Sequence, residues 1–146
     1  MDSKPILVVE DNPDHLELTV LTLQEQDADA VIVMARDGVE ALDYLFGQGA
    51  YAGRDTNKQP AFILLDMKLP KLSGLDVLRS VRSNPLTALV PVVMLTSSSE
   101  QSDIIACYQS GANSFVRKSV DFGDFTEKLS RLQAYWLRVN ESIATA

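Results

Sequence analysis

Five short apolar segments constrain the fold of this chain more than any other feature of its sequence. Val, Ile, Leu and Phe dominate them without regular polar alternation, which is typical of strands buried on both faces. Helical patterns separate the segments, and such alternation predicts a parallel sheet covered on both sides. We therefore expect an α/β fold, a doubly wound five-stranded parallel sheet with five helices in the flavodoxin-like order 2-1-3-4-5. The segments are Ile6–Val9, Ala30–Met34, Ala61–Leu65, Val90–Leu95 and Asn113–Val116.

Capping residues indicate where the helices begin. The first helix should start after Asn12, with Pro13 in its first turn. Capping boxes are expected at the next two helices, at Asp37 with Glu40 and at Ser73 with Asp76. The fourth helix should begin within residues 97–100 and end at Gly111, and the fifth should span residues 121–139.

Apolar stripes predict the buried face of each helix and a surface that the sheet cannot cover. The expected stripes are Val39, Leu42 and Phe46 on the second helix, and Phe122, Phe125, Leu129, Leu132 and Trp136 on the fifth. The fifth helix would be about 28 Å long, whereas a strand of five residues spans only about 17 Å. Tyr135 and Leu137 flank the stripe at its overhanging end, so we predict a homodimer through the fourth and fifth helices. Alternatively, the stems of Arg131 and Arg138 cover this surface in a monomer.

Composition limits the classes of function. The chain of 146 residues fits one compact domain, and no apolar run approaches the length of a membrane span. The single cysteine, Cys107, cannot form an internal disulfide, which favours a cytoplasmic location. The net charge of −7 argues against binding to nucleic acid, and a single histidine excludes a histidine-rich zinc site. The polar, glycine-rich segment 47–60 is long for a connection and predicts a surface loop insertion.

Charged and polar side chains follow four of the five apolar segments. Glu10 and Asp11 follow the first, Asp66 follows the third, Thr96 follows the fourth and Lys118 follows the fifth. In an open parallel sheet, ligands bind at the carboxyl ends of the strands, where the strand order reverses. Three converging carboxylates suit Mg²⁺, and a hydroxyl and an ammonium group beside them suit an anionic ligand. The set therefore predicts a phosphoryl-acceptor site at Asp66, although acids at strand ends can also serve only as helix caps.

Five segments in register resemble the receiver domain of bacterial response regulators. They are Val8–Asn12, Leu64–Pro70, Ser73–Leu75, Leu95–Ser97 and Phe115–Lys118. The resemblance implies one receiver domain over residues 1–146 without an output domain, phosphorylated on Asp66 by a sensor histidine kinase. It also implies Mg²⁺ held by Glu10, Asp11, Asp66 and the backbone carbonyl of Lys68, and a switch pair of Thr96 and Phe115. The segment Glu10–Asp14, the long loop and Lys118–Phe122 resemble stand-alone regulators paired with bacterial phytochromes.

One departure and three rival functions follow from the same residues. The family usually has a proline, often after a cis bond, where this chain has Ser119, which strongly prefers trans and could redirect Lys118. A haloacid dehalogenase-type phosphohydrolase would need an aspartate at Lys68, and a flavodoxin-like cofactor binder would need a phosphate loop in place of the acids after Val9. A receiver that docks without being phosphorylated is the third alternative.

Overall fold

The fold is the predicted parallel sheet. The computed structural model describes residues 4–143, and its sheet has five parallel strands in the order β2-β1-β3-β4-β5. This order confirms the predicted fold class. No helix within the described residues is long and apolar enough to cross a membrane. The strands are β1 (Ile6–Val9), β2 (Ile32–Ala35), β3 (Phe62–Leu65), β4 (Val92–Thr96) and β5 (Ser114–Arg117).

Two strands begin two residues later than their apolar segments predict. The backbone N–H of Ala30 donates to the Asp27 carbonyl in the turn before β2, so Ala30 does not pair with β1. Before β4, Pro91 has no N–H to donate, although its carbonyl accepts from the N–H of Ile63. The apolar segments therefore extend past the ladder: Val90 stays buried before β4, whereas Val31 before β2 is 51% exposed.

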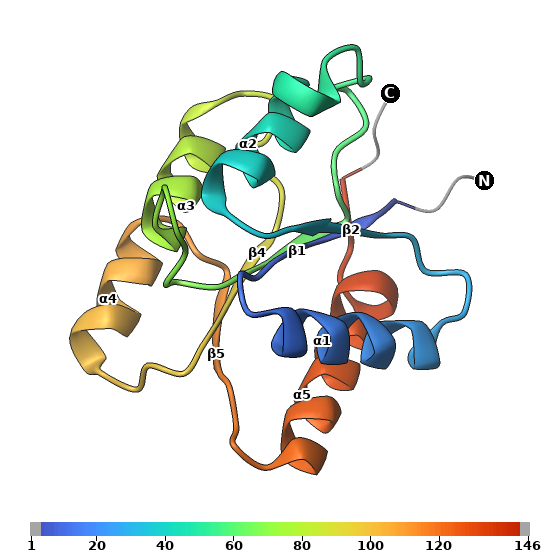
Figure 1. Cartoon of the computed structure of the whole chain (residues 1–146), viewed down its shortest axis with the longest axis vertical. Coiled ribbons are helices and arrows are strands. Elements are labelled where there is room, and N and C mark those ends of the chain that lie inside the picture. Colours follow the sequence, from blue (N-terminus) through green and yellow to red (C-terminus); the bar gives the residue numbers. More distant parts are fainter. Residues whose placement is uncertain (1–3, 144–146) are drawn as a thin grey trace.

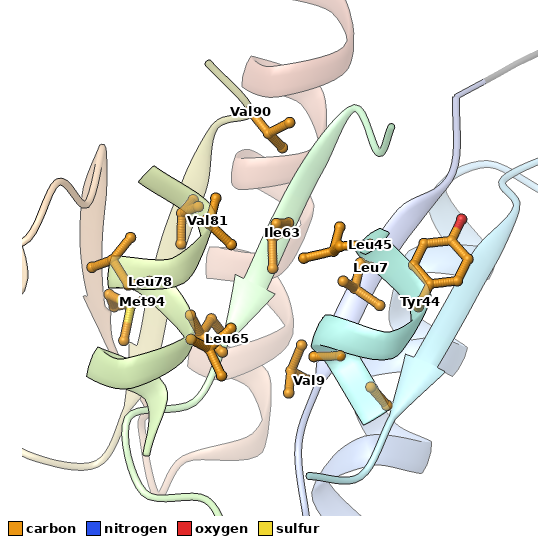
Figure 2. Close-up of a cluster of buried hydrophobic side chains, with 14 of the residues drawn as sticks. Leu7, Val9, Tyr44, Leu45, Ile63, Leu65, Leu78, Val81, Val90 and Met94 are labelled. Carbon is orange, nitrogen blue, oxygen red and sulfur yellow. The ribbon is translucent and has the colours of Figure 1, made fainter. Parts of the chain in front are cut away.

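Helices cover both faces of the sheet (Figure 1). They are α1 (Pro13–Gln26), α2 (Gly38–Phe46), α3 (Gly74–Ser83), α4 (Gln101–Gln109) and α5 (Phe122–Ala134). Side chains alternate between the faces of each strand, so one strand supplies two cores. One core joins Leu7, Val9, Ile63 and Leu65 to α2, α3 and α4 (Figure 2), and the other joins Ile6, Val8, Phe62 and Leu64 to α1 and α5.

The helix caps follow the sequence closely, with one difference. Asn12 accepts hydrogen bonds from the first turn of α1, and the capping box of α3 is complete between Ser73 and Asp76. Asp37 caps α2 by accepting from the Glu40 N–H at 2.8 Å. The Glu40 carboxylate, however, accepts from the N–H of Arg36 rather than that of Asp37, at 3.1 Å. The predicted capping box of α2 is therefore only half formed.

Two of the predicted stripe residues lie outside the core. Val39 is 38% exposed and Phe122 is 66% exposed. On α2 the buried residues are Gly38, Ala41, Tyr44 and Leu45, so the buried face lies about a third of a turn from the predicted stripe. Phe122 is the first residue of α5, before the helix packs against α1 and the sheet. The face that a helix buries depends on the elements packed against it, so the apolar stripe of one helix does not fix that face.

The end of α5 and the segment 47–60 both differ from the prediction. The α-helix stops at Ala134 and continues as a π-helical turn, Tyr135–Val139, where the prediction was an uninterrupted helix. The segment 47–60 contains a short 3₁₀ turn, Gly49–Tyr51. Arg54 organises this segment by stacking on the Tyr44 ring, 4.0 Å from its centroid, and by donating to the Tyr44 and Leu45 carbonyls. Its status as an insertion stays a prediction.

The two cores make a matched pair of variants informative. Leu129→Ala should lower the free energy of unfolding by about 2–5 kcal/mol, because Leu129 is fully buried between α5 and the sheet. Phe122→Ala should change it by less than about 0.5 kcal/mol, because Phe122 is mostly exposed. Urea unfolding of both variants measures this difference. A comparable loss in Phe122→Ala would place that ring in the core after all.

Candidate functional site

Three carboxylates meet at the carboxyl end of the sheet. The pairing of β1 with β3 sets Val9 opposite Leu65, so the residues that follow leave the sheet side by side. Ligand oxygens of Glu10, Asp11 and Asp66 lie within 4.8 Å of one another. Glu10 and Asp66 are buried, whereas Asp11 is exposed. The pocket therefore joins two desolvated carboxylates to one that faces solvent.

Lys118 reaches this pocket from the end of β5. Its ammonium group donates to Asp66 Oδ2 at 3.0 Å and to Glu10 Oε1, and its side chain is 11% exposed. The backbone N–H of Lys118 donates to the Thr96 carbonyl at 2.7 Å, which fixes the lysine beside the end of β4. Residues 4–143 contain no cis peptide bond, so the bond before Ser119 is trans. The serine thus does not prevent Lys118 from entering the pocket.

The loop after β3 holds Asp66 in place. Asp66 Oδ1 accepts a hydrogen bond from the Lys68 N–H at 3.1 Å, and the Asp66 N–H donates to the Val9 carbonyl at the same distance. The start of α3 packs so closely that a Cβ on Gly74 would lie 2.2 Å from the Asp66 carbonyl oxygen. Only glycine allows this approach. The role predicted for the Lys68 carbonyl as a metal ligand stays a prediction.

Thr96 and Phe115 occupy neighbouring strands, and within residues 4–143 no hydrogen bond joins either side chain to the three carboxylates. Thr96 is 1% exposed, and its hydroxyl oxygen accepts from the Ser98 N–H at 3.4 Å. Phe115 is half-buried and packs against the core formed with α2, α3 and α4. It pairs with Met94, two residues before Thr96 on β4. Their proposed joint role as a switch stays a prediction.

Burial and charge perturb the pKa values of the pocket. Burial raises the pKa of Glu10 to about 7, and the nearby carboxylate of Asp66 adds to this effect while Lys118 opposes it. Burial alone would lower the pKa of Lys118, but its contacts with Glu10 and Asp66 outweigh burial and raise it. Lys118 therefore stays charged at neutral pH. Two carboxylates that share one lysine make it easier for Glu10 to keep a proton.

His15 is a neighbour of the site that the sequence analysis did not identify. Its Nδ1 lies 3.5 Å from Lys118 Nζ and 3.7 Å from Glu10 Oε1. The residue stands in the first turn of α1, four positions after Asp11. Helical side chains tilt toward the N-terminus of their helix, so a residue in the first turn of α1 can reach back toward the end of β1, and this is the signal from which His15 could have been found.

The donor set fits a divalent cation. Carboxylate oxygens are the ligands preferred by hard cations, which take few protein ligands and keep part of their water. Glu10, Asp11 and Asp66 provide such oxygens at one point, and the exposed Asp11 leaves the position open to solvent. The arrangement is an acidic metal-binding pocket with a lysine that contacts two of its three carboxylates.

Comparisons with known proteins identify similar chains along nearly the whole sequence. The family model described as "Response regulator receiver domain" matches residues 6–130. The response regulator Rcp1 of Synechocystis sp. is 34% identical over 134 residues, which are 92% of this chain and 89% of the relative. The structure of the Mn²⁺-bound form of Rcp1 matches this chain with a TM-score of 0.88 and 33% identity. The match covers 97% of this chain and 99% of the Rcp1 chain.

Two further solved structures are similar. The structure of a phosphorylated cyanobacterial phytochrome response regulator, RcpA, has a TM-score of 0.89 and 32% identity, and the match covers 96% of this chain and 98% of that one. The bacteriophytochrome response regulator AtBRR is 42% identical with a TM-score of 0.77, and both chains are covered completely. The similarity therefore extends over the sheet, the helices and the acidic pocket.

Without metal, the stability of the protein should depend on the proton carried by Glu10. Between about pH 4.5 and about pH 7 the folded protein keeps this proton, whereas the unfolded chain has lost it, so raising the pH favours unfolding. Across this range the wild type should lose up to about 3 kcal/mol more stability than Glu10→Gln. Urea unfolding in a chelating buffer measures the loss, with the exposed Glu25→Gln as control. Equal losses in wild type and Glu10→Gln would contradict the shift.

Proposed function

This chain belongs to the response regulator receiver domain family, and on that basis we propose that it is a signalling switch phosphorylated on Asp66 by a sensor histidine kinase. The observation that carries the proposal is the position of Asp66 between two kinds of charge. Its carboxylate lies beside those of Glu10 and Asp11, and it shares the Lys118 ammonium group with Glu10. An oxygen of Asp66 attacks the phosphorus of the phosphohistidine, a P–O bond forms, and the P–N bond to the imidazole breaks.

The neighbouring residues have distinct roles in this proposal. Glu10, Asp11, Asp66 and the Lys68 carbonyl would hold Mg²⁺, and the bound ion would supply positive charge to neutralise the phosphoryl oxygens. The choice of Mg²⁺ is supported by the all-oxygen donor set, and the Mn²⁺-bound structure of Rcp1 supports a divalent ion. Lys118 binds a phosphoryl oxygen, because its raised pKa keeps it charged and its ammonium group already lies 3.0 Å from Asp66.

Thr96 and Phe115 would transmit the phosphorylation to the surface. The Thr96 hydroxyl leaves the Ser98 N–H and donates to the phosphoryl group, and the Phe115 ring turns inward beside it. The long Ser98 contact, at 3.4 Å, is easily exchanged for a charge-assisted hydrogen bond. The changed surface near β5 would then pass the signal to a partner protein by direct contact.

A bacterial phytochrome is the kinase class that we propose as partner, in the cytoplasm. The support is the similarity to RcpA and AtBRR, both of which are phytochrome response regulators. A haloacid dehalogenase-type hydrolase is less well supported, because Lys68 stands where that enzyme needs an aspartate and the matching family model is a receiver. If Asp66 accepts no phosphate, the remaining alternative is a receiver that docks on a partner protein without being phosphorylated.

Phosphorylation of Asp66 can be tested by intact mass. Wild-type protein incubated with Mg²⁺ and acetyl phosphate should gain one phosphoryl group, and Asp66→Asn should gain none. Chelation of Mg²⁺ should also prevent the gain. The matched control is Asp55→Asn in the exposed loop, which should be modified like the wild type. Modification of Asp66→Asn at the wild-type rate would assign the reaction to another residue.

We also propose a homodimer through α4 and α5. Tyr135 and Leu137, in the π-helical turn that follows α5, are 47% and 36% exposed, and Ile105 and Tyr108 on α4 are 51% and 49% exposed. Both helices flank β5 at the edge of the sheet (Figure 1). Exposed apolar and aromatic side chains grouped around one sheet edge favour a partner surface.

Sedimentation at micromolar concentration tests the dimer. Wild type should sediment as a dimer, and Tyr135→Glu with Leu137→Glu should sediment as a monomer, because buried glutamates would lack partners. Ile105→Glu with Tyr108→Glu should also weaken the dimer. A monomeric wild type would refute the proposal, and a dimer that survives both pairs of substitutions would place the interface elsewhere.

A further inference from the structure

His15 lies at the rim of the acidic pocket, and the proposed phosphorylation does not use it. The residue stands in the first turn of α1, and the exposed fraction of its side chain is 52%. Its backbone N–H donates to Asn12 Oδ1 at 3.1 Å, so the N-terminal cap of α1 fixes the backbone that carries the imidazole. Its Nδ1 lies 3.5 Å from Lys118 Nζ and 3.7 Å from Glu10 Oε1. An imidazole nitrogen therefore faces the ammonium group on which the charge balance of the site depends.

The Lys118 ammonium group has as many acceptors around it as it has N–H donors. A lysine has three such donors, and three acceptors within residues 4–143 surround its Nζ. Two are the charged oxygens Glu10 Oε1 and Asp66 Oδ2, and the third is His15 Nδ1. The imidazole accepts in the tautomer whose Nδ1 carries no proton. Its contact of 3.5 Å is longer than the 3.0 Å contact with Asp66, because a charged acceptor attracts the ammonium group more strongly.

Phosphorylation changes both charged acceptors and leaves the imidazole unchanged. A phosphoryl group on Asp66 turns that carboxylate into an acyl phosphate, so the negative charge moves to the phosphoryl oxygens. Glu10 belongs to the cluster of carboxylates that fits a divalent cation, whereas His15 does not. The ammonium group therefore exchanges a carboxylate for a phosphoryl oxygen, while its contact with His15 is free to persist.

A lysine that is held from one side binds a new acceptor at a lower entropic cost. The side chain of Lys118 loses rotamer freedom when its ammonium group is fixed. A contact that does not change with phosphorylation limits that freedom before the phosphoryl group arrives. Lys118 follows β5 and His15 stands on α1, so two separate elements of the fold hold the two partners in place.

We propose that His15 is a positioning residue for Lys118. Its imidazole accepts one N–H of the ammonium group, so the remaining N–H donors point at the phosphoryl oxygens on Asp66. His15 acts through Lys118 and does not itself bind the phosphoryl group. The inference rests on the proposed function, because the phosphoryl group on Asp66 is the ligand at which the lysine is aimed. A rival role for the imidazole ring is steric cover of the pocket against water, which needs no hydrogen-bond acceptor.

The binding of beryllium fluoride, a mimic of the phosphoryl group, tests this role in the presence of Mg²⁺. The amide oxygen in His15→Asn replaces Nδ1 as an acceptor, and His15→Leu has a side chain of similar shape without one. In an amide NMR titration, His15→Leu should bind about three- to tenfold more weakly than the wild type, the loss expected for one hydrogen bond. His15→Asn should bind within about twofold of the wild type. Glu17→Leu, exposed on the same helix, is the matched control and should bind like the wild type.

The mobility of the Lys118 side chain gives a second readout that needs neither metal nor phosphate. NMR relaxation of its Cε methylene group, measured on the unmodified protein in a chelating buffer, should show a more mobile side chain in His15→Leu than in the wild type. His15→Asn should restore the wild-type mobility, because it restores the acceptor.

The results separate the role of His15 from the function on which it rests. A wild type that binds no beryllium fluoride would refute the phosphoryl site and, with it, the role of His15. If the wild type binds and His15→Leu binds equally or more tightly, only the role of His15 is overturned. Equal weakening in His15→Leu and His15→Asn would assign the effect to steric cover by the ring. Equal Lys118 mobility in the wild type and His15→Leu would also overturn the positioning role.

Discussion

The parallel pairing of β1 with β3 is the constraint on which the acidic pocket depends. Val9 lies opposite Leu65, and this register sends Glu10 and Asp66 off the sheet together. Two buried carboxylates so close repel each other and lose hydration, which costs free energy unless a cation compensates. Lys118 supplies that cation from the end of β5, and β4 lies between β5 and β3. The charge balance of the pocket therefore requires four adjacent strands to be assembled.

The loops around the pocket are held by close backbone packing. Gly74 brings the start of α3 against the Asp66 carbonyl, and a Cβ on Gly38 would lie 2.7 Å from the Leu72 carbonyl oxygen. Lys71 adopts a left-handed backbone with φ of 69° and pairs with Asp37 at 3.3 Å. The starts of α2 and α3 therefore both pack against the loop that follows Asp66. This preorganisation explains why a polar site can be rigid at the end of a strand.

β5 connects the pocket to the free edge of the sheet. Lys118 follows it into the pocket, Phe115 packs from it into one core, and Val116 packs from it against the other core. A change in the position of Phe115 would therefore alter both the core and the groove wall. The same short strand leads into the lysine that balances the charge of the site and forms one wall of the groove beside α5.

The sequence by itself determined the class of fold, the strand positions to within two residues, the N-terminal caps and the acids at the strand ends. These depend on local patterns, since burial on both faces selects apolar runs and a cap needs only residues a few positions apart. The tertiary structure alone decided that α2 buries Tyr44 instead of Val39, that His15 approaches Lys118 and that burial raises the pKa of Glu10 to about 7. It also decided that β5 leaves a basic groove open. Each of these depends on groups far apart in the chain, and only the packed sheet and helices bring such groups together.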